Sequence, residues 1–451
     1  MPGYGCPVGK QPQFAYSPWA IGSRRYGISR HARQAPRTLA TRAEMDAKNE
    51  IRLLLDGKEA FPAWLEAIGA AKSEILLEMY WFESDKTGRT FAEALSKRAR
   101  DGLDVFLLYD SVGSIGAERS MFEDMESAGV RVIEYNPIAP WRRRFRLDRV
   151  GTRDHRKILV VDTEVGFVGG INICDQQASR ESGGGGWRDD AVEIRGPSVN
   201  ELRALFFDTW IKSGGPSARK LEALAMRTRE ALVAAAREQL GAPAPRRLLG
   251  IGAPTPERSI TVASSADLAA PPVVQVIGHA ASAARRTLRR VYLQQIRHAR
   301  RKILIANSYF IPDITIRRGL ERASARGVEV RVILPRDSDV PSVGYASRAL
   351  YARLMRAGIQ IHEWVDGMLH AKCALIDEWA TVGSYNLDYR SLLYNLEANV
   401  ASVEPAFVES VERSFRADIQ RCVQVDPVAW SKRSRWSRVL EWMHYYVRKL
   451  L

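Results

Sequence analysis

The sequence places a histidine and a lysine two residues apart at two positions, each at the start of a short apolar run. His155 and Lys157 begin HRKILVVD, and His370 and Lys372 begin HAKCALID. Alternate side chains of a β-strand point to the same face, so each pair presents an imidazole and an ammonium together at a strand end. A single pair of this kind is an ordinary solvated strand end. Recurrence of the whole HxKxxxxD spacing favours a functional role.

A small residue and an amide follow each pair, after the next turn. Gly170 and Asn172 lie in VGGIN, and Ser384 and Asn386 lie in VGSYN. If the two copies face each other, the combined group suits a phosphodiester. One imidazole attacks phosphorus, the other protonates the departing oxygen, and the lysines and amides hold the phosphate oxygens. Because fixed cations then carry the charge stabilisation, this hypothesis requires neither a metal nor a cofactor.

The elements that must position these residues are also written twice. Apolar runs beginning at Glu74 and at Lys302 are each followed by an amphipathic helix, a second strand, a helix end, a third strand and the motif strand. This order predicts duplication of one α/β unit. Apolar runs that alternate with helices predict mostly parallel sheets covered on both faces. The expected organisation is a disordered basic tail (1–45), a first half (46–211), a helical and Pro/Gly-rich connection (212–259), a second half (260–425) and a basic amphipathic C-terminal helix (426–451).

The charge balance points to a polyanionic partner. The 451 residues include 67 Lys and Arg against 52 Asp and Glu, a formal net charge of +15. Nucleic acid and an anionic membrane surface both fit this excess, and a generally arginine-rich composition would produce it without either. The four cysteines show no CxxC pair, which disfavours a disulfide framework or a zinc site. No stretch reaches the roughly twenty apolar residues of a membrane span, so we expect a soluble or peripheral protein.

The paired motifs resemble the HKD motifs of the phospholipase D superfamily, and the resemblance runs from about Ile51 to about Cys422. Three further stretches are similar to the bacterial cardiolipin synthases, in particular to the short cardiolipin synthase B type: AIGAAKSEILLEMYWFESDKTG, WRDDAVEIRGPSVNELRALFFDTW and WATVGSYNLDYRSLLYNLEANV. The resemblance implies a pseudo-dimer of two α/β sandwich halves that share one active site. It also implies that the two histidines are the nucleophile and the acid/base, in an order that stays open, and that the lysines and asparagines bind phosphate.

Carboxylates complete the expected site. The resemblance matches the motif aspartates to Asp162 and Asp377, which lie at the far end of the strand from the histidine and are expected to support structure. Each imidazole also needs a carboxylate to fix its tautomer and stabilise its cation. By position the candidates are Asp189 and Glu397, with Asp190 a close competitor. For each of them, a surface salt bridge is the alternative interpretation.

One spacing differs between the copies. Six residues separate Asp162 from Gly169, whereas five separate Asp377 from Gly383. Either the second turn is locally tighter, or Ser384 and Asn386 are displaced relative to their motif histidine.

Two basic segments are candidates for contact with the polyanion. The loop NPIAPWRRRFRLDRV carries five arginines around two aromatic residues and suits nucleic acid or lipid headgroups. The C-terminal WSKRSRWSRVLEWMHYYVRKLL predicts one helix with an apolar stripe flanked by cations: Trp436, Val439, Leu440, Met443, Val447 and Leu450. Such a helix suits a membrane interface. Docking of the same stripe on the protein's own core is the alternative.

Together these features predict a peripheral enzyme at the cytoplasmic face of the cell membrane that acts on anionic phospholipids. The expected reaction transfers a phosphatidyl group to a histidine and then to the hydroxyl of a second lipid, which joins two phosphatidylglycerol molecules, or phosphatidylglycerol and another phospholipid, into cardiolipin. Hydrolysis by a phospholipase D-type enzyme and cleavage of nucleic acid by a nuclease of the same superfamily are the alternatives. A non-catalytic binding module is disfavoured because both histidine sets are intact. The sequence indicates no protein partner.

Overall fold

The computed structural model describes residues 49–139, 151–216, 273–278 and 287–448. The predicted tail (1–45), most of the predicted connection (217–259) and the arginine-rich loop (141–149) lie outside the described residues, as does Leu450.

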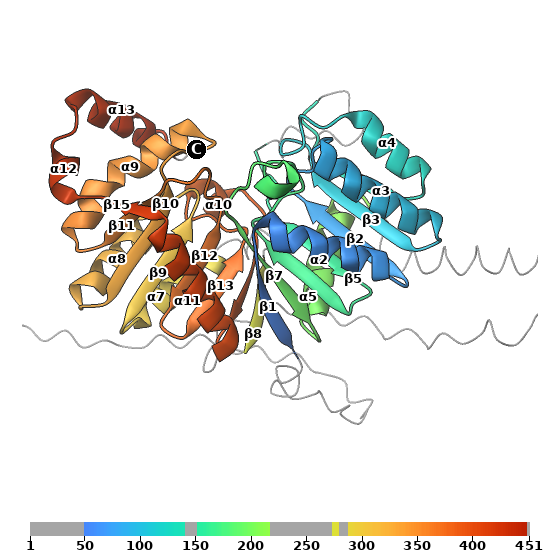
Figure 1. The fold of residues 1–451 in the computed structure, drawn as a ribbon, viewed down its shortest axis with the longest axis horizontal. Coiled ribbons are helices and arrows are strands. Elements are labelled where there is room, and N and C mark those ends of the chain that lie inside the picture. The colour runs from blue at the N-terminus through green and yellow to red at the C-terminus, as the bar shows by residue number, and fades with distance from the viewer. Residues whose placement is uncertain (1–48, 140–150, 217–272, 279–286, 449–451) are drawn as a thin grey trace, which may run out of the picture. The chain divides into compact units, whose positions relative to one another are not determined.

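The first half consists of a sheet between two layers of helices (Figure 1). Odd and even positions of its buried strands face different helix layers, because alternate side chains of a strand point to opposite faces. Ile75 and Leu77 pack with one set of helices, and Leu76 packs with the other. Its elements are β1 (Glu50–Leu55), α2 (Asp56–Ala70), β2 (Glu74–Met79), α3 (Lys86–Arg100), β3 (Asp104–Asp110), α4 (Arg119–Ser127), β4 (Arg131–Tyr135), β5 (Lys157–Val161), β6 (Val165–Gly169), β7 (Asp190–Arg195) and α5 (Val199–Lys212).

The second half repeats this arrangement and then continues into a C-terminal extension. Its elements are β8 (Val274–Gly278), α7 (Thr287–His298), β9 (Lys302–Asn307), α8 (Ile314–Ala325), β10 (Glu329–Pro335), α9 (Pro341–Arg356), β11 (Gln360–Trp364), β12 (Lys372–Ile376), β13 (Trp379–Gly383), α10 (Tyr389–Leu393), β14 (Ala398–Ser402), α11 (Pro405–Gln420), β15 (Cys422–Gln424), α12 (Pro427–Ser431) and α13 (Arg435–Tyr446).

The strand order confirms the duplication. The first sheet runs β1-β7-β6-β5-β2-β3-β4, and the second runs β8-β14-β13-β12-β9-β10-β11 with β15 added at its edge. The prediction of mostly parallel sheets is wrong. Within each described sheet only the β2-β3-β4 and β9-β10-β11 pairs are parallel, and the other pairs are antiparallel. Short hairpin turns after the motif strands make β5-β6 and β12-β13 antiparallel, because a chain that turns back within a few residues pairs antiparallel. Longer connections bring the other antiparallel pairs together.

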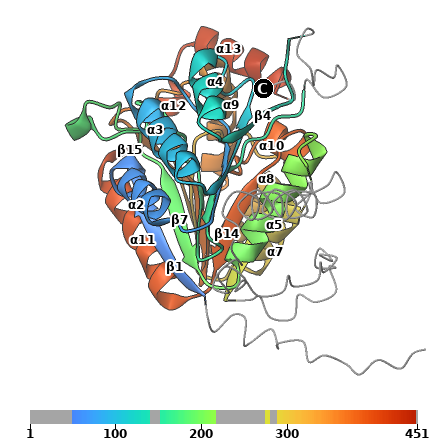
Figure 2. The same ribbon diagram turned by 90° about the vertical axis from the view of Figure 1, so that its right-hand side faces the viewer.

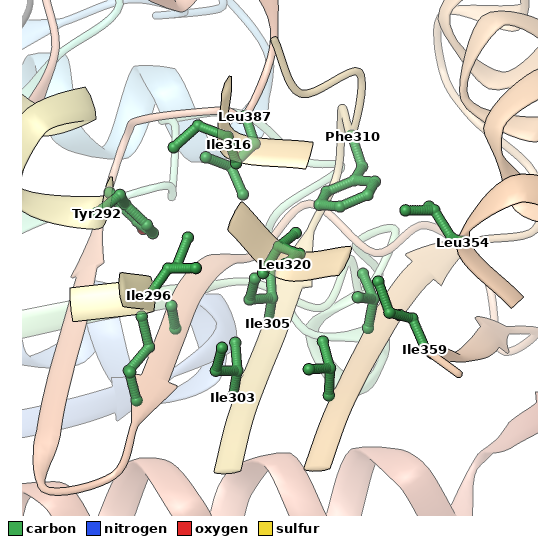
Figure 3. Packing of buried hydrophobic residues seen from close by; sticks show 14 of the residues in the cluster. Tyr292, Ile296, Ile303, Ile305, Phe310, Ile316, Leu320, Leu354, Ile359 and Leu387 are labelled. Carbon is green, nitrogen blue, oxygen red and sulfur yellow. The ribbon is translucent and has the colours of Figure 1, made fainter. Parts of the chain in front are cut away.

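Two of the three cores belong to one half each, and the third is shared. In the second half, side chains of β9, including Ile303 and Ile305, pack under α7, α8 and α9 (Figure 3). The shared core joins Phe206 and Trp210 of α5 to Val400 and Phe415 of the second half through the strands between them. Figure 2 shows α2 and α3 on one side of the strands and α5 on the other. The two halves are therefore joined by a continuous apolar core.

Both motif strands begin at the same kind of position. Lys157 of β5 pairs antiparallel with Met79 at the carboxyl end of β2, and Lys372 of β12 pairs with Asn307 at the carboxyl end of β9. We call this end of the sheets, where β2, β3, β9 and β10 finish, the histidine edge. His155 and His370 lie there because each stands two positions before the first residue of its motif strand.

The strand register settles the difference in turn length. Ile158 pairs with Val168 in the first half, and Cys373 pairs with Val382 at the equivalent position of the second. The first turn has two residues with positive φ, Asp162 (52°) and Thr163 (57°), whereas in the second only Asp377 (51°) has one. The second turn is therefore locally tighter, and Ser384 and Asn386 keep their place relative to His370.

The C-terminal segment forms two helices where one was predicted. Ser434 caps α13 by accepting a hydrogen bond from the backbone N–H of Trp436, which separates it from α12. Buried Glu441 and Tyr445 face the protein, and α13 packs on α9 (Figure 1). The apolar stripe predicted at Trp436, Val439, Leu440, Met443 and Val447 is exposed. In the part of the chain that the structure describes, every helix falls short of the length and apolar character needed to cross a membrane.

Candidate active site

Two backbone bridges bring the histidine motifs of the halves together. The N–H of His155 donates to the carbonyl of Leu396 at 3.0 Å, and the N–H of His370 donates to the carbonyl of Arg188 at 2.7 Å. Leu396 and Arg188 immediately precede Glu397 and Asp189. Each half therefore holds the histidine of the other half next to one of its own carboxylates.

The side chains continue this crossed arrangement. His155 Nδ1 lies 3.0 Å from Glu397 Oε2, and His370 Nδ1 lies 2.6 Å from Asp189 Oδ2. All four side chains are buried. The competing candidate, Asp190, instead pairs with Arg188 at 2.7 Å. Because Nδ1 of each ring is engaged, Nε2 is the nitrogen available for chemistry.

Different neighbours hold the two carboxylates. Glu397 accepts hydrogen bonds from Ser391 Oγ at 2.7 Å and from Ser384 Oγ. Asp189 accepts from the backbone N–H of Asp190 at 2.8 Å. Gly170 takes the position of Ser384 in the first half, and a Cβ there would lie 2.2 Å from Asp189 Oδ1. Glycine is thus required at 170 by the close approach of Asp189, while serine at 384 donates to Glu397.

The two lysines lie at the histidines. Lys157 Nζ donates to the His155 carbonyl at 2.7 Å and lies 4.9 Å from the centre of the Tyr80 ring. Lys372 Nζ donates to the His370 carbonyl and lies 3.0 Å from His370 Nδ1. Burial and the nearby Lys372 together lower the pKa of Lys157 to about 7, and burial also lowers the pKa of Lys372. An anion bound between the two ammonium groups would relieve this repulsion.

Burial also sets the protonation of the rings. Burial lowers the pKa of His155 below its ordinary value and the pKa of His370 well below it, and Lys157 and Lys372 act in the same direction. Burial raises the pKa of Asp189. For Glu397 burial is opposed and outweighed by His155, Lys157 and Ser384, so its pKa is lowered. These shifts favour the neutral imidazole, which is the form that attacks phosphorus, and they make an imidazolium at this position a readier proton donor.

The two asparagines are held by their carbonyl oxygens. Asn172 Oδ1 accepts from the backbone N–H of Trp81 at 3.3 Å, and Asn386 Oδ1 accepts from Ser308 Oγ at 2.8 Å. Both side chains are buried at the histidine edge. Since the oxygen is occupied, the amide nitrogen of each is the group that can donate to a phosphate oxygen.

The motif aspartates lie at the opposite end of their strands. Asp162 accepts hydrogen bonds from the backbone N–H groups of Lys72, Ser73 and Glu74 at 2.6, 2.8 and 2.9 Å. Asp377 accepts equivalent hydrogen bonds from the backbone N–H groups of the three residues that lead into β9: Arg300, Arg301 and Lys302. The structure thus separates both aspartates from the histidines and places them at the turns that lead into β2 and β9.

Sequence inspection missed four side chains that contact the histidines. The centre of the Tyr80 ring lies 4.8 Å from the centre of the His155 ring. The ring centres of Trp187 and Tyr309 lie 5.6 and 6.2 Å from that of His370. Gln177 Nε2 lies 3.4 Å from both Asp189 Oδ2 and His370 Nδ1. Aromatic residues after each inner strand, in MYWF and NSYF, were a usable signal for the tyrosines. Gln177 lies in an irregular loop and gave none.

Within the described ranges, no group of three or more His, Cys, Asp and Glu side chains is arranged to hold a metal ion. Metal-free chemistry stays a prediction, and chelation tests it below.

Comparison with known proteins assigns the family. The model of the family described as "Cardiolipin synthase, PLD-like domain" matches residues 64–183 and 292–419, which are one region in each half. The chain belongs to this family, and it is an enzyme, a phosphatidyltransferase with the duplicated PLD-like fold.

Individual relatives agree with this assignment. The probable cardiolipin synthase YwiE of Bacillus subtilis is 31% identical over 89% of this chain and 72% of its own length. Cardiolipin synthase 2 of Bacillus anthracis is 30% identical over 90% of this chain and 71% of its own. Among solved structures, phosphatidylserine synthase of Haemophilus influenzae superposes with a TM-score of 0.65 and 15% identity, over 91% of this chain and 98% of the other, and shows the fold alone.

Proposed function

We propose that this enzyme joins two phosphatidylglycerol molecules into cardiolipin, with release of glycerol, through a phosphohistidine. The observation that carries the proposal is the crossed pair of imidazoles, His155 on Glu397 and His370 on Asp189, with Lys157 and Lys372 beside them. The names of the relatives above, which are cardiolipin synthases, support the choice of lipid.

In the first step, Nε2 of one histidine attacks the phosphorus of phosphatidylglycerol. A P–N bond forms, and the P–O bond to the headgroup glycerol breaks. The other histidine, as imidazolium, gives its proton to the departing oxygen, and glycerol leaves. The two lysines and the amide nitrogens of Asn172 and Asn386 stabilise the charge that develops on the phosphate oxygens.

In the second step, a hydroxyl of the glycerol headgroup of another phosphatidylglycerol attacks the phosphorus. The second histidine, now neutral, accepts the proton of that hydroxyl, while the P–N bond breaks and cardiolipin forms. Each carboxylate contributes by stabilising the imidazolium that its histidine becomes during the cycle. Two displacements leave the enzyme unchanged and the phosphorus with its original configuration.

The same proposal places the enzyme at the cytoplasmic face of the cell membrane, as a peripheral protein. Its substrates have two acyl chains and reside in a bilayer, and the chain carries a formal net charge of +15, which suits a surface of anionic phospholipid. Phosphatidylglycerol is itself such a lipid.

A direct test incubates the pure protein with phosphatidylglycerol in mixed micelles and, separately, with DNA. Products are identified by mass, with His155→Ala and His370→Ala proteins as controls for contaminating activity. We expect cardiolipin and glycerol in equal amounts. Phosphatidic acid as the sole lipid product would indicate a hydrolase, and nucleotide fragments without a lipid product would indicate a nuclease. Protein denatured at neutral pH during turnover should carry the mass of one phosphatidyl group.

A further inference from the structure

The outer face of α13 is apolar and cationic. Trp436, Met443 and Tyr446 are 82, 63 and 85% exposed, and Val439 and Trp442 between them are exposed too. Such a concentration of large apolar side chains on one exposed face is unusual for a helix that only covers its own protein. The face therefore has the character of an interaction surface.

The charges of α13 are sorted between its two faces. Its sole acidic residue, Glu441, is buried and pairs with Arg433. Lys432, Arg435 and Arg438 are exposed, and none of them pairs with a carboxylate among the described residues. The outer face thus combines unneutralised cations with indole, phenol and aliphatic groups. Anionic lipid headgroups over acyl chains offer both complements, whereas nucleic acid leaves the apolar groups without one.

The carboxyl end of α13 lies next to the active site. The ring of His444 lies 5.1 Å from that of Tyr345 in the first turns of α9, and the guanidinium of Arg448 lies 5.6 Å from the ring of Tyr389. Tyr389 begins α10, three residues after Asn386. The carboxyl end of α13 therefore lies close to the start of α10, which follows Asn386 at the histidine edge.

Exposed apolar side chains continue along this edge. Ile115, 69% exposed, lies in the loop after β3, which is held to the end of β2 because Ser114 Oγ accepts from the backbone N–H of Phe82 at 3.0 Å. Exposed Val340 follows β10 and is next to Asp339, whose carboxylate accepts from the Tyr309 hydroxyl at 2.6 Å. Tyr309 in turn contacts His370. Both halves thus present apolar groups where the active site lies.

We propose that α13 and the Ile115 and Val340 loops form one membrane-docking face, which seats the histidine edge against an anionic bilayer. The inference rests on the proposed function for its lipid substrates, but the surface it names is separate from the catalytic groups. Docked in this way, the enzyme would receive both lipids from the bilayer without lifting them into water.

The test measures co-sedimentation with vesicles of phosphatidylglycerol and phosphatidylcholine. In Arg435→Gln/Arg438→Gln we expect binding about 25-fold weaker at low salt, because each cation near an anionic surface contributes about fivefold. This difference should shrink in high salt. In Trp436→Ser/Met443→Ser/Tyr446→Ser binding should fall by about 100-fold or more at every salt concentration, since apolar burial is not screened. Ile115→Asp should weaken binding from the other half of the protein.

Val273→Ser and Arg300→Gln are the matched controls. Both residues are exposed and lie at the edge opposite the histidines, so both proteins should bind vesicles like the unaltered enzyme. Equal loss in the controls, or unchanged sedimentation of the α13 variants, would overturn the docking face. So would α13 variants that change the oligomeric state while vesicle binding persists, because a second copy would then cover the face.

Turnover of a short-chain phosphatidylglycerol below its micelle concentration separates this inference from the proposed function. The α13 variants should retain that turnover. If the unaltered protein shows no lipid turnover but the sedimentation results hold, the proposed reaction fails and the docking face stands.

Discussion

His370 of the second half is paired with Asp189 of the first: their Nδ1 and Oδ2 atoms lie 2.6 Å apart, across 181 positions of sequence. His155 and Glu397 form the reciprocal pair, at 3.0 Å. Each motif histidine therefore takes its carboxylate from the other half. Duplication therefore did more than double a binding motif, because each copy supplies the group that sets the tautomer of the other copy's imidazole.

Removing the charge of either carboxylate should depress turnover while the protein stays folded. We expect Asp189→Asn and Glu397→Gln to lower kcat by about 10²–10⁴-fold, because a neutral amide does not stabilise the imidazolium. Asp190→Asn is the matched control, since that carboxylate pairs with Arg188 and contacts no histidine among the described residues. Its melting temperature should fall while kcat is largely kept. A larger kcat loss for Asp190→Asn than for Asp189→Asn would reverse the assignment.

The roles of the two histidines should become distinguishable with a substrate whose leaving group needs no proton. On phosphatidylglycerol, His155→Ala and His370→Ala should each lose at least about 10²-fold in turnover. With a p-nitrophenyl phosphodiester, the variant that retains the nucleophile should release one equivalent of p-nitrophenol in a burst and then stall. The other variant should show no burst, which identifies the attacking residue. Sustained turnover by both variants would disprove the shared site.

The alkaline limb of the pH profile should report Lys157. Burial lowers its pKa to about 7, with Lys372 acting in the same direction and Glu397, Asp189 and Asp154 opposing. The cation is lost as the pH rises through that value, so kcat/KM should fall above about pH 7. A bound phosphodiester favours the ammonium form of Lys157, so kcat should begin to fall at a higher pH than kcat/KM. In Lys157→Arg, which stays charged, the fall in kcat/KM should shift to higher pH. If the fall stays at the same pH, it reports the titration of another group.

The motif aspartates should affect stability more than chemistry. Burial alone would raise the pKa of Asp162. Hydrogen bonds from the backbone at Lys72, Ser73 and Glu74 outweigh burial and lower this pKa below its ordinary value. This stabilisation is present above about pH 4 and is lost as the pH falls through the lowered pKa. Asp162→Asn should lower the free energy of unfolding by about 1–3 kcal/mol at pH 7. Measured by urea unfolding, the difference in free energy of unfolding between Asp162→Asn and the unaltered protein should become smaller at low pH. The kcat of the folded variant should be unchanged.

Chelation should leave activity intact. The fixed cations Lys157 and Lys372 lie at the histidines, so the phosphate charge has protein partners. Turnover on detergent-dispersed phosphatidylglycerol should therefore be the same before and after dialysis against a chelator. Loss of activity that a divalent metal restores would contradict the proposed mechanism.

The direction of the strands could not be predicted from their composition. The strands around the motifs are buried on both faces, so they are apolar throughout and look the same whether their neighbours run parallel or antiparallel. The hairpin turns at Asp162 and Asp377 set the direction of β6 and β13, and the longer connections set that of the other antiparallel strands. The C-terminal stripe was ambiguous for a similar reason, since apolar periodicity shows that a helix has an apolar face but not what that face contacts. Packing of Glu441 and Tyr445 against the protein left the stripe outside.

The sequence by itself determined the duplication, the family resemblance and the histidine, lysine and asparagine sets, because these depend on residue types at short spacing and on strand alternation. Only the tertiary structure decided which carboxylate faces which imidazole. Asp189 immediately precedes β7 and Asp190 begins it, yet the first pairs with His370 and the second with Arg188. Neighbouring positions of an extended chain point in opposite directions, and only the packing of the halves shows which of them meets the imidazole. The contact of Gln177 with Asp189 and His370 likewise could not be predicted, because it joins segments that only the packing of the two halves brings together.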